Sequence, residues 1–164
     1  APDVCVLTPM AWNTDAEDLA AFIRHHSAPD AVVFLYGYSY GVGHFGVRFS
    51  RALDGFGIPI PVQVSSDGIR RKRLLKLLSL RFFRSLVSIP VPGNVGTAFG
   101  FTQSNDPLLR GHELRAESPK TEIHMIDQPG HDHYSIDASK YFHRVALAEA
   151  RDLIQKTQDH PATC

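Results

Sequence analysis

The chain of 164 residues has little of several features that would place it in a specialised class. It has two cysteines, and because Cys5 lies in an apolar run and Cys164 is the last residue, we expect no structural disulfide. Lys and Arg number 17, as do Asp and Glu, which argues against a general nucleic-acid binder because phosphate binding needs a cationic surplus. No hydrophobic run is long enough to span a membrane, and no P-loop sequence is present.

The overall composition is that of an ordinary globular protein. Hydrophobic residues make up 43% and charged residues 21% of the chain, which is typical of a soluble domain with a substantial core. The length predicts one domain over residues 1–156, followed by a flexible tail over 157–164. We expect no bound cofactor. The oligomeric state stays open, and so does the compartment, cytoplasmic or secreted.

The most informative motif is the pentapeptide Gly37-Tyr38-Ser39-Tyr40-Gly41. It follows the apolar run Ala31–Tyr36 and precedes a helix-like segment, Val42–Leu53. A G-x-S-x-G sequence between a strand and a helix is typical of a nucleophile elbow, in which the serine stands at the apex of a strained turn. The two glycines are expected to leave room for that turn. The amide of Tyr40 is then a candidate donor of an oxyanion hole.

Strand-like and helix-like segments alternate along most of the chain. The expected strands are Val4–Thr8, Ala31–Tyr36, Ile58–Ser65, Val95–Gln103 and Thr121–Ile126. The expected helices are Thr14–His26, which a capping box of Thr14 and Glu17 would begin, Val42–Leu53 and Ala138–Gln155. This alternation predicts an α/β fold: a mostly parallel sheet of five to six strands with helices on both faces.

A serine hydroxyl becomes a nucleophile only when a base removes its proton, and histidine is the usual base. In parallel sheets the functional residues gather beyond the carboxyl ends of the strands. Among nine histidines, His131 and His133 lie in the loop between the last expected strand and the last expected helix. We favour His133, because the residues that follow it read as a helix cap that would fix its position, and keep His131 as the alternative.

Two aspartates follow strand ends and are candidates to orient the histidine. Asp106 follows the fourth expected strand and Asp67 the third. Each also reads as a turn residue, because Asp-Pro and Asp-Gly dipeptides often start turns. We favour Asp106, because its strand comes just before the strand that leads to the histidines, with Asp67 as the alternative. A second oxyanion amide is expected after the first strand, at Met10 or Ala11.

Together these motifs resemble the α/β-hydrolase family in its minimal form, the small lipases and cutinase-like esterases, over nearly the whole chain. The matching segments are Val4–Thr8, Ala31–Gly41, Ile60–Asp67, Val95–Asp106 and Thr121–Asp137. The resemblance implies a three-layer sandwich with Ser39 as nucleophile, Asp106 as acid, and His133 or His131 as base. The loop Thr8-Pro9-Met10-Ala11-Trp12 departs from the family, many of whose members carry a His-Gly pair there.

A basic and apolar segment, Arg70–Arg84, concentrates seven of the 17 positive charges. It reads first as a surface helix whose leucines pack inward while its charges stay solvated. A peripheral contact with lipid is the functional alternative, in which the apolar side of the segment would contact lipid and its Arg and Lys side chains would meet anionic head groups. A nucleic-acid patch ranks last, since the net charge of the chain is zero.

The leading hypothesis is therefore a serine hydrolase that cleaves a small-molecule or lipid carboxylic ester. Two alternatives use other chemistry. A metal-dependent hydrolase could use the His131-Asp132-His133 loop as ligands, and a non-catalytic module could keep the fold for binding alone.

Overall fold

The central element is a four-stranded sheet in which every adjacent pair of strands is parallel, in the order β1-β2-β4-β6. The computed structural model describes residues 4–70, 87–106 and 109–159. The strands are β1 (Phe34–Tyr38), β2 (Ile60–Ser66), β4 (Val95–Thr102) and β6 (Glu122–Asp127). The two inner strands, β2 and β4, are the most buried, as expected where neighbours cover both edges and helices cover the faces.

Two short strands, β3 (Ile89–Val91) and β5 (Leu114–Ala116), pair in parallel as a separate small sheet. The sequence did not predict either of them. Each has only three residues, which is too short for an alternating pattern to stand out. Their pairing brings residues 109–113 back toward the end of the main sheet.

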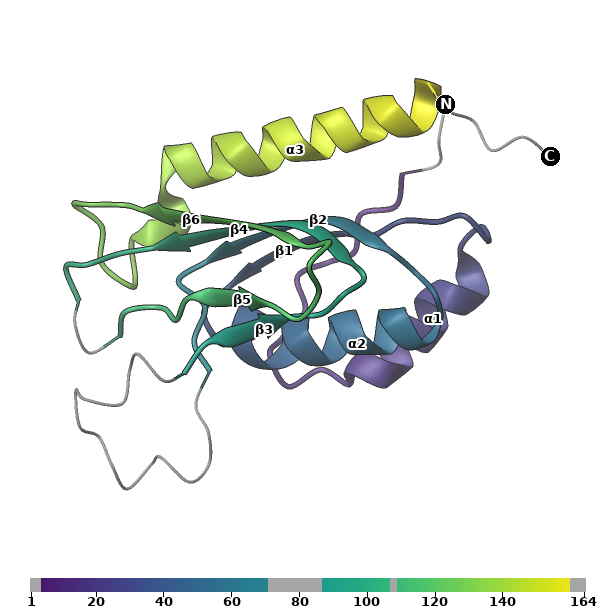
Figure 1. The fold of residues 1–164 in the computed structure, drawn as a ribbon, viewed down its shortest axis with the longest axis horizontal. Helices are drawn as coiled ribbons and strands as arrows, with labels where there is room; N and C mark the ends of the chain where they lie inside the picture. The colour runs from purple at the N-terminus through teal and green to yellow at the C-terminus, as the bar shows by residue number, and fades with distance from the viewer. Residues whose placement is uncertain (1–3, 71–86, 107–108, 160–164) are drawn as a thin grey trace.

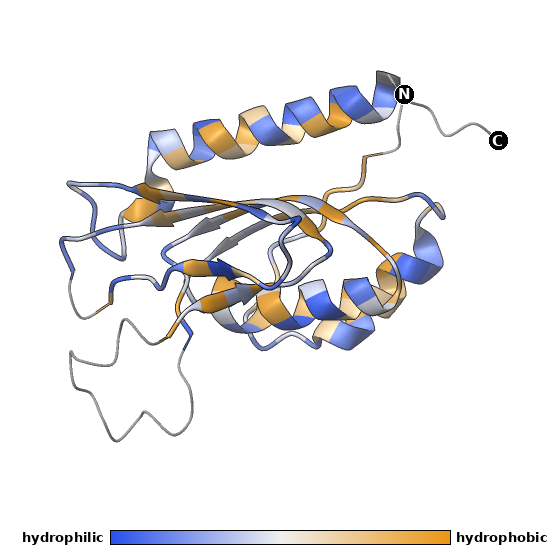
Figure 2. Cartoon of the chain, in the orientation of Figure 1, coloured by the Kyte–Doolittle hydropathy of each residue, from blue (hydrophilic) through white to orange (hydrophobic). Residues whose placement is uncertain are grey.

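Helices lie on either side of the main sheet (Figure 1). On one side are α1 (Ala16–His26) and a continuous helix made of a π-helical segment (Gly41–Gly46) and α2 (Val47–Gly55). On the other side a short 3-10 turn (Ile136–Ala138) leads into α3 (Lys140–Asp159). Hydrophobic and hydrophilic positions alternate along α2 and α3 (Figure 2), as expected of helices that cover a sheet with one face.

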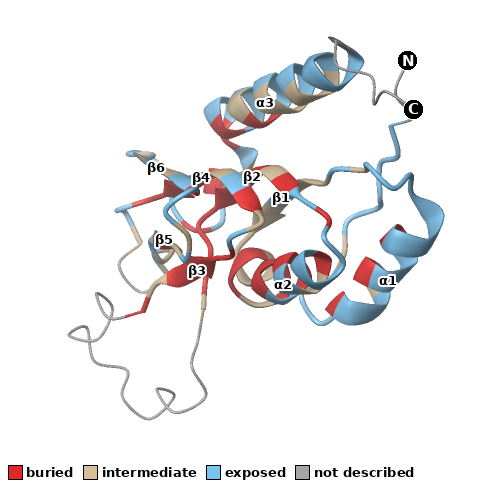
Figure 3. Cartoon of the chain, turned by 45° about the vertical axis from the view of Figure 1, so that its right-hand side comes forward, coloured by how far each residue is buried: buried red, intermediate tan, exposed pale blue. Residues whose placement is uncertain are grey.

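Two hydrophobic clusters hold these layers together. The larger joins α1, α2, β3 and one face of the main sheet, and the smaller joins the opposite face to the first turns of α3, including Phe142 and Ala146. Burial in α1 is confined to its inner side, and α3 is buried mainly at its beginning (Figure 3). An open apolar groove of about 440 Å³ lies where α3 passes β1, lined by Phe34, Tyr36, His143, Ala146, Leu147 and Ala150.

The prediction of an α/β fold with a mostly parallel sheet and helices is confirmed, but the main sheet is smaller than predicted. Residues 4–8, the expected first strand, form neither a strand nor a helix, and Val4 and Val6 are exposed. The β-branched residues of this segment favour a strand, but the segment pairs with no strand of the main sheet. The edge strand on that side is therefore β1. Cys5, which belongs to that expected strand, is likewise exposed.

Smaller corrections concern the ends of elements. The N-cap of α1 is Asp15, whose carboxylate accepts hydrogen bonds from the amides of Glu17 and Asp18, rather than Thr14. The last helix extends to Asp159, so residues 157–159 of the expected tail are helical. The basic segment 71–84 and residues 160–164 lie outside the described residues. Within the described ranges, no helix combines the length and apolar character that a membrane span requires.

Candidate active site

The strand register brings the ends of β1 and β2 side by side. Tyr38 pairs with Ser66, so the residues that follow them, Ser39 and Asp67, leave the same edge of the sheet as neighbours. The amide of Ser39 donates to the Ser66 carbonyl over 3.0 Å, and the amide of Asp67 donates to the Phe101 carbonyl over 2.7 Å. Because the carboxyl ends of parallel strands meet at one edge, these are the positions where a site is expected.

Ser39 and Asp67 are also the two non-glycine residues of the described chain with a positive φ, at 53° and 43°. Left-handed backbone is unfavourable for residues with a Cβ and is found where the surrounding structure enforces it, often at functional sites. The two turns are joined to each other, because the amide of Ile69 donates to the Ser39 carbonyl over 3.0 Å. The turn at Ser39 and the turn at Asp67 are therefore one connected unit.

Glycines allow the two turns to pack closely, but the glycine with the closest contact is not one of the two in the G-x-S-x-G motif. A Cβ at Gly37 would lie 3.1 Å from Val42 Cγ2, a tight contact, whereas a Cβ at Gly41 would meet nothing within 4 Å. The close approach is instead at Gly43, where a Cβ would lie 1.9 Å from the Ile69 carbonyl oxygen. The helix after Ser39 therefore packs directly on the loop that carries Asp67.

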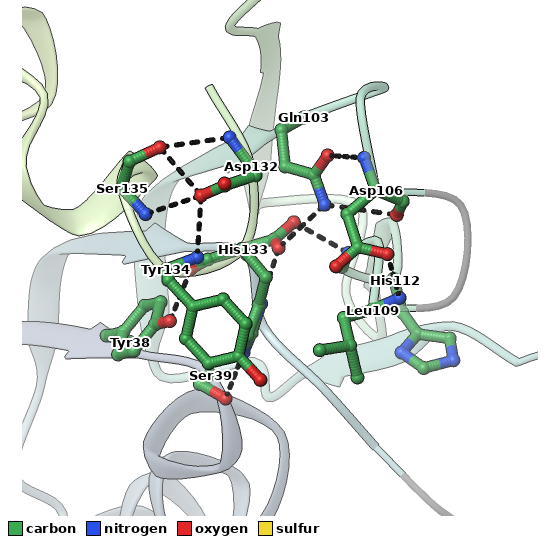
Figure 4. A network of polar contacts seen from close by, with 12 residues as sticks. Tyr38, Ser39, Gln103, Asp106, Leu109, His112, Asp132, His133, Tyr134 and Ser135 are labelled. Atoms are coloured by element: carbon green, nitrogen blue, oxygen red, sulfur yellow. Dashed lines mark hydrogen bonds and ion pairs between the residues drawn. The ribbon is translucent and has the colours of Figure 1, made fainter.

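Three side chains form a continuous line of hydrogen bonds at this edge. Ser39 Oγ lies 3.1 Å from His133 Nε2 (Figure 4), and His133 Nδ1 lies 2.6 Å from Asp67 Oδ2. A carboxylate can only accept, so Nδ1 carries a proton; in the neutral imidazole Nε2 is then the acceptor and the Ser39 hydroxyl is the donor. This is the protonation pattern that a serine nucleophile and its base require.

His133 is held in place from several directions. Its ring stacks on Tyr38 at 5.1 Å between centroids, and the Tyr38 hydroxyl donates to the His133 carbonyl. The neighbouring Asp132 carboxylate accepts hydrogen bonds from the amides of Tyr134 and Ser135 and from the Ser135 hydroxyl (Figure 4). These bonds hold the turn that contains His133. The imidazole is therefore buried and oriented, with a side-chain exposure of only 7%.

The carboxylate that contacts the histidine is that of Asp67, the alternative from the sequence, and not that of Asp106. Asp67 is fully buried. The backbone amide of Asp106 instead donates to the Gln103 side chain, and the Asp106 carboxylate accepts a hydrogen bond from the Leu109 amide at 3.1 Å (Figure 4). The choice of Asp106 assumed that the strand before the histidine strand in sequence carries the acid. In space β2 is the neighbour of β1, so its end lies nearer Ser39 than the turn after β4 does.

The alternative base, His131, lies elsewhere in the loop, where its amide donates to the Gln128 carbonyl over 3.3 Å. A metal site built on His131 and His133 is also poorly supported, because both ring nitrogens of His133 already face Asp67 and Ser39. Within residues 4–70, 87–106 and 109–159, no group of three His, Cys, Asp or Glu side chains is arranged to hold a metal ion.

The expected oxyanion side of the site is aromatic. Tyr40 follows Ser39 at the start of the helix, where amide groups carry partial positive charge. Its ring stacks on His44 at 5.2 Å and lies 6.0 Å from Trp12, which brings the loop with Met10 and Ala11 beside the elbow. Met10 packs on the larger core cluster, and Ala11 is exposed.

The histidine under Tyr40 has a lowered pKa. Burial is the main cause of the lower pKa of His44, and the positive charges of Arg70 and Arg48 add to it.

Sequence reasoning missed two residues of this site, Gln103 and Gly111. Gln103 Nε2 donates to Asp67 Oδ2 over 3.2 Å, and the Gly111 amide donates to Asp67 Oδ1 over 2.6 Å. Gln103 directly follows β4, so its place at a strand end was a usable signal. The sequence around Gly111 contains no such signal, because its segment lies beside Asp67 only through the pairing of β3 with β5.

Tyr38 yields a prediction about alkaline pH. Burial, followed by the negative charges of Asp137 and Asp67, raises the pKa of Tyr38 from 10.0 to about 12. Between these two values the unfolded chain has lost a proton that the folded chain keeps, so folding stability is expected to fall as pH rises from 10 to 12. Absorbance titration of phenolate in wild type and Tyr38→Phe isolates this group, with circular dichroism to verify folding. A difference curve centred near the ordinary tyrosine value would contradict the expectation.

Comparison with known proteins adds no family assignment: no family model matches the chain, and no curated protein matches it.

Proposed function

We propose that this protein is a serine hydrolase that cleaves carboxylic esters through Ser39, His133 and Asp67. The observation that carries the proposal is the unbroken line from Ser39 Oγ to His133 Nε2, at 3.1 Å, and from His133 Nδ1 to Asp67 Oδ2, at 2.6 Å. Nucleophile, base and orienting acid at hydrogen-bond distance are the recurring arrangement of activated serines on unrelated folds. The strained strand-to-helix turn at Ser39 supports the same role.

In the proposed acylation step, His133 Nε2 takes the Ser39 proton as Oγ attacks the ester carbonyl. The Nδ1–H bond to Asp67 stabilises the imidazolium that forms. The amide of Tyr40, with one from Met10 or Ala11, donates to the developing oxyanion. His133 then passes its proton to the leaving alkoxide, so that the alcohol departs and an acyl group remains on Ser39.

Deacylation repeats the step with water. His133 Nε2 removes a proton from the water, which attacks the acyl carbonyl, and the proton returns to Ser39 Oγ as the carboxylic acid leaves. Amide cleavage would use the same residues, but esters are the easier substrates because an amide nitrogen donates its lone pair more strongly into the carbonyl, and because an alkoxide leaves more readily than an unprotonated amide nitrogen. We therefore take carboxylic esters as the substrate class.

The same geometry supports membership of the α/β-hydrolase family as a reduced, lipase- or esterase-like form. A parallel sheet with helices on either side and an elbow between β1 and the following helix are features of that three-layer fold. The smaller sheet is the main departure. A small-molecule or lipid ester remains the proposed partner, and lipid contact through Arg70–Arg84 stays a prediction, because residues 71–84 lie outside the described residues.

Reaction with a fluorophosphonate probe tests the proposal on the wild-type chain. Intact mass is expected to increase by one adduct, with loss of fluoride, and peptide mapping is expected to place the adduct on Ser39. Heat-denatured protein should not react, since only the folded chain brings His133 to the serine. A folded protein that forms no adduct, or that carries it on another residue, would overturn the proposal and favour the non-catalytic alternative. Labelling that a chelator abolishes would favour the metal alternative.

A further inference from the structure

Gln103 is a polar side chain with no access to solvent, placed at the end of β4 against Asp67. Its Nε2 donates to Asp67 Oδ2 over 3.2 Å and to the Asp106 carbonyl over 3.3 Å, and its Oε1 accepts the Asp106 amide over 2.7 Å (Figure 4). A buried amide is costly unless its donors and acceptors are satisfied, and here both ends are used.

The turn that contains Asp106 determines which end of the amide faces Asp67. The Asp106 amide is a donor, so it selects the Gln103 oxygen as its partner and leaves the NH₂ group to face Asp67 and the Asp106 carbonyl. In the flipped orientation two oxygens would face each other at the carboxylate. The backbone of Asp106 therefore orients the side chain that contacts the acid.

Asp67 depends on such donors because it is itself fully buried. Its Oδ1 accepts the Gly111 amide at 2.6 Å, and its Oδ2 accepts both His133 Nδ1 and Gln103 Nε2. An ionised carboxylate in a dry site is retained only when hydrogen bonds replace its water. A Cβ at position 111 would lie 2.6 Å from Oδ1, so a glycine is required there. Gln103 is the one side-chain donor to the carboxylate besides His133 in the described part of the chain.

We propose that Gln103 is a positioning residue of the active site, which holds the Asp67 carboxylate turned toward His133. It acts through Asp67 and His133. The inference rests on the proposed function, since an oriented Asp67 carboxylate matters through the orientation and base strength that it gives His133 at Ser39.

Three variants of the full chain separate this role from a structural one. Gln103→Leu removes the donor, and Gln103→Glu keeps the shape and the acceptor for the Asp106 amide but places a carboxyl group against Asp67. Gln63→Leu is the matched control. Gln63, on β2, is a buried glutamine like Gln103, but its side chain donates to Ser65 Oγ and not to Asp67. Circular dichroism and thermal melting establish that each variant is folded.

The first readout is the rate of fluorophosphonate labelling at Ser39 as a function of pH. Gln103→Leu is expected to lower the rate about tenfold to a hundredfold, as for the loss of a hydrogen bond to a charged group, while Gln63→Leu leaves it unchanged. Gln103→Glu is expected to be slow at neutral pH and to recover relative to wild type as pH falls, because its carboxyl group becomes a donor when protonated. A folded Gln103→Leu with wild-type rate and pH profile would overturn the proposal.

The second readout needs no turnover. The low-field proton signal of His133 Nδ1–H, assigned by its loss in His133→Gln, reports the hydrogen bond to Asp67. We expect it to shift or broaden in Gln103→Leu and to stay unchanged in Gln63→Leu. If wild type shows this signal but no labelling, the hydrolase proposal fails while the positioning role is still decided by the variants. An identical signal in wild type and Gln103→Leu would overturn the positioning role.

Discussion

Replacing Ser39 by alanine is expected to reduce ester turnover by about 10⁶-fold, the scale seen when a triad nucleophile is removed. Without Oγ no acyl-enzyme can form, and His133 has no proton to accept at 3.1 Å. The fold should persist, because the turn is held by backbone hydrogen bonds from Ser39 to Ser66 and from Ile69 to Ser39. The measurement is kcat/KM on a short-chain chromogenic ester, beside circular dichroism of the same sample.

Ser66→Ala is the matched control for this experiment. Ser66 ends the neighbouring strand and is fully buried, and its hydroxyl has no hydrogen-bond partner among the described residues. Removing an unsatisfied buried hydroxyl is expected to leave turnover unchanged and to keep or raise stability, by up to about 1 kcal/mol. Equal turnover in Ser39→Ala and Ser66→Ala would show that Ser39 is not the nucleophile.

Replacing Asp67 by asparagine is expected to lower kcat by about 10⁴-fold with the fold retained. The asparagine oxygen can still accept the Gly111 amide, but its NH₂ group would face His133 Nδ1 and can only donate. The imidazole proton then moves to Nε2, which can no longer accept the proton of Ser39. The defect should therefore appear in kcat and in fluorophosphonate labelling. Because the NH₂ group also replaces the acceptor of Gln103 Nε2, the thermal midpoint is expected to fall as well.

Asp106→Asn decides between the two aspartates that the sequence left open. Its side chain accepts the Leu109 amide, which an asparagine oxygen can also do, and its backbone contacts with Gln103 do not depend on the carboxylate. We expect turnover close to wild type. A loss in Asp106→Asn comparable to that in Asp67→Asn would contradict the assignment of Asp67 as the acid.

The sequence was most informative about local structure around Ser39. A strand, a G-x-S-x-G turn and a helix are each encoded by neighbouring residues, so the elbow could be predicted without tertiary information. The same holds for His133, whose place between the last strand and the last helix follows from the order of elements. Residues 4–8 show the limit of this reasoning, because a strand-like pattern forms a strand only where a partner is available.

What the sequence determined by itself was the alternation of strands and helices, the turn that carries Ser39, and a short set of candidates for base and acid. Only the tertiary structure showed that Asp67, and not Asp106, contacts His133, and only it revealed Gln103 and Gly111. The reason is physical: strand order and register are set by pairing between distant segments, and the order β1-β2-β4-β6 places the end of β2 next to Ser39. A carboxylate buried among donors from three separate segments has no signature in any one of them.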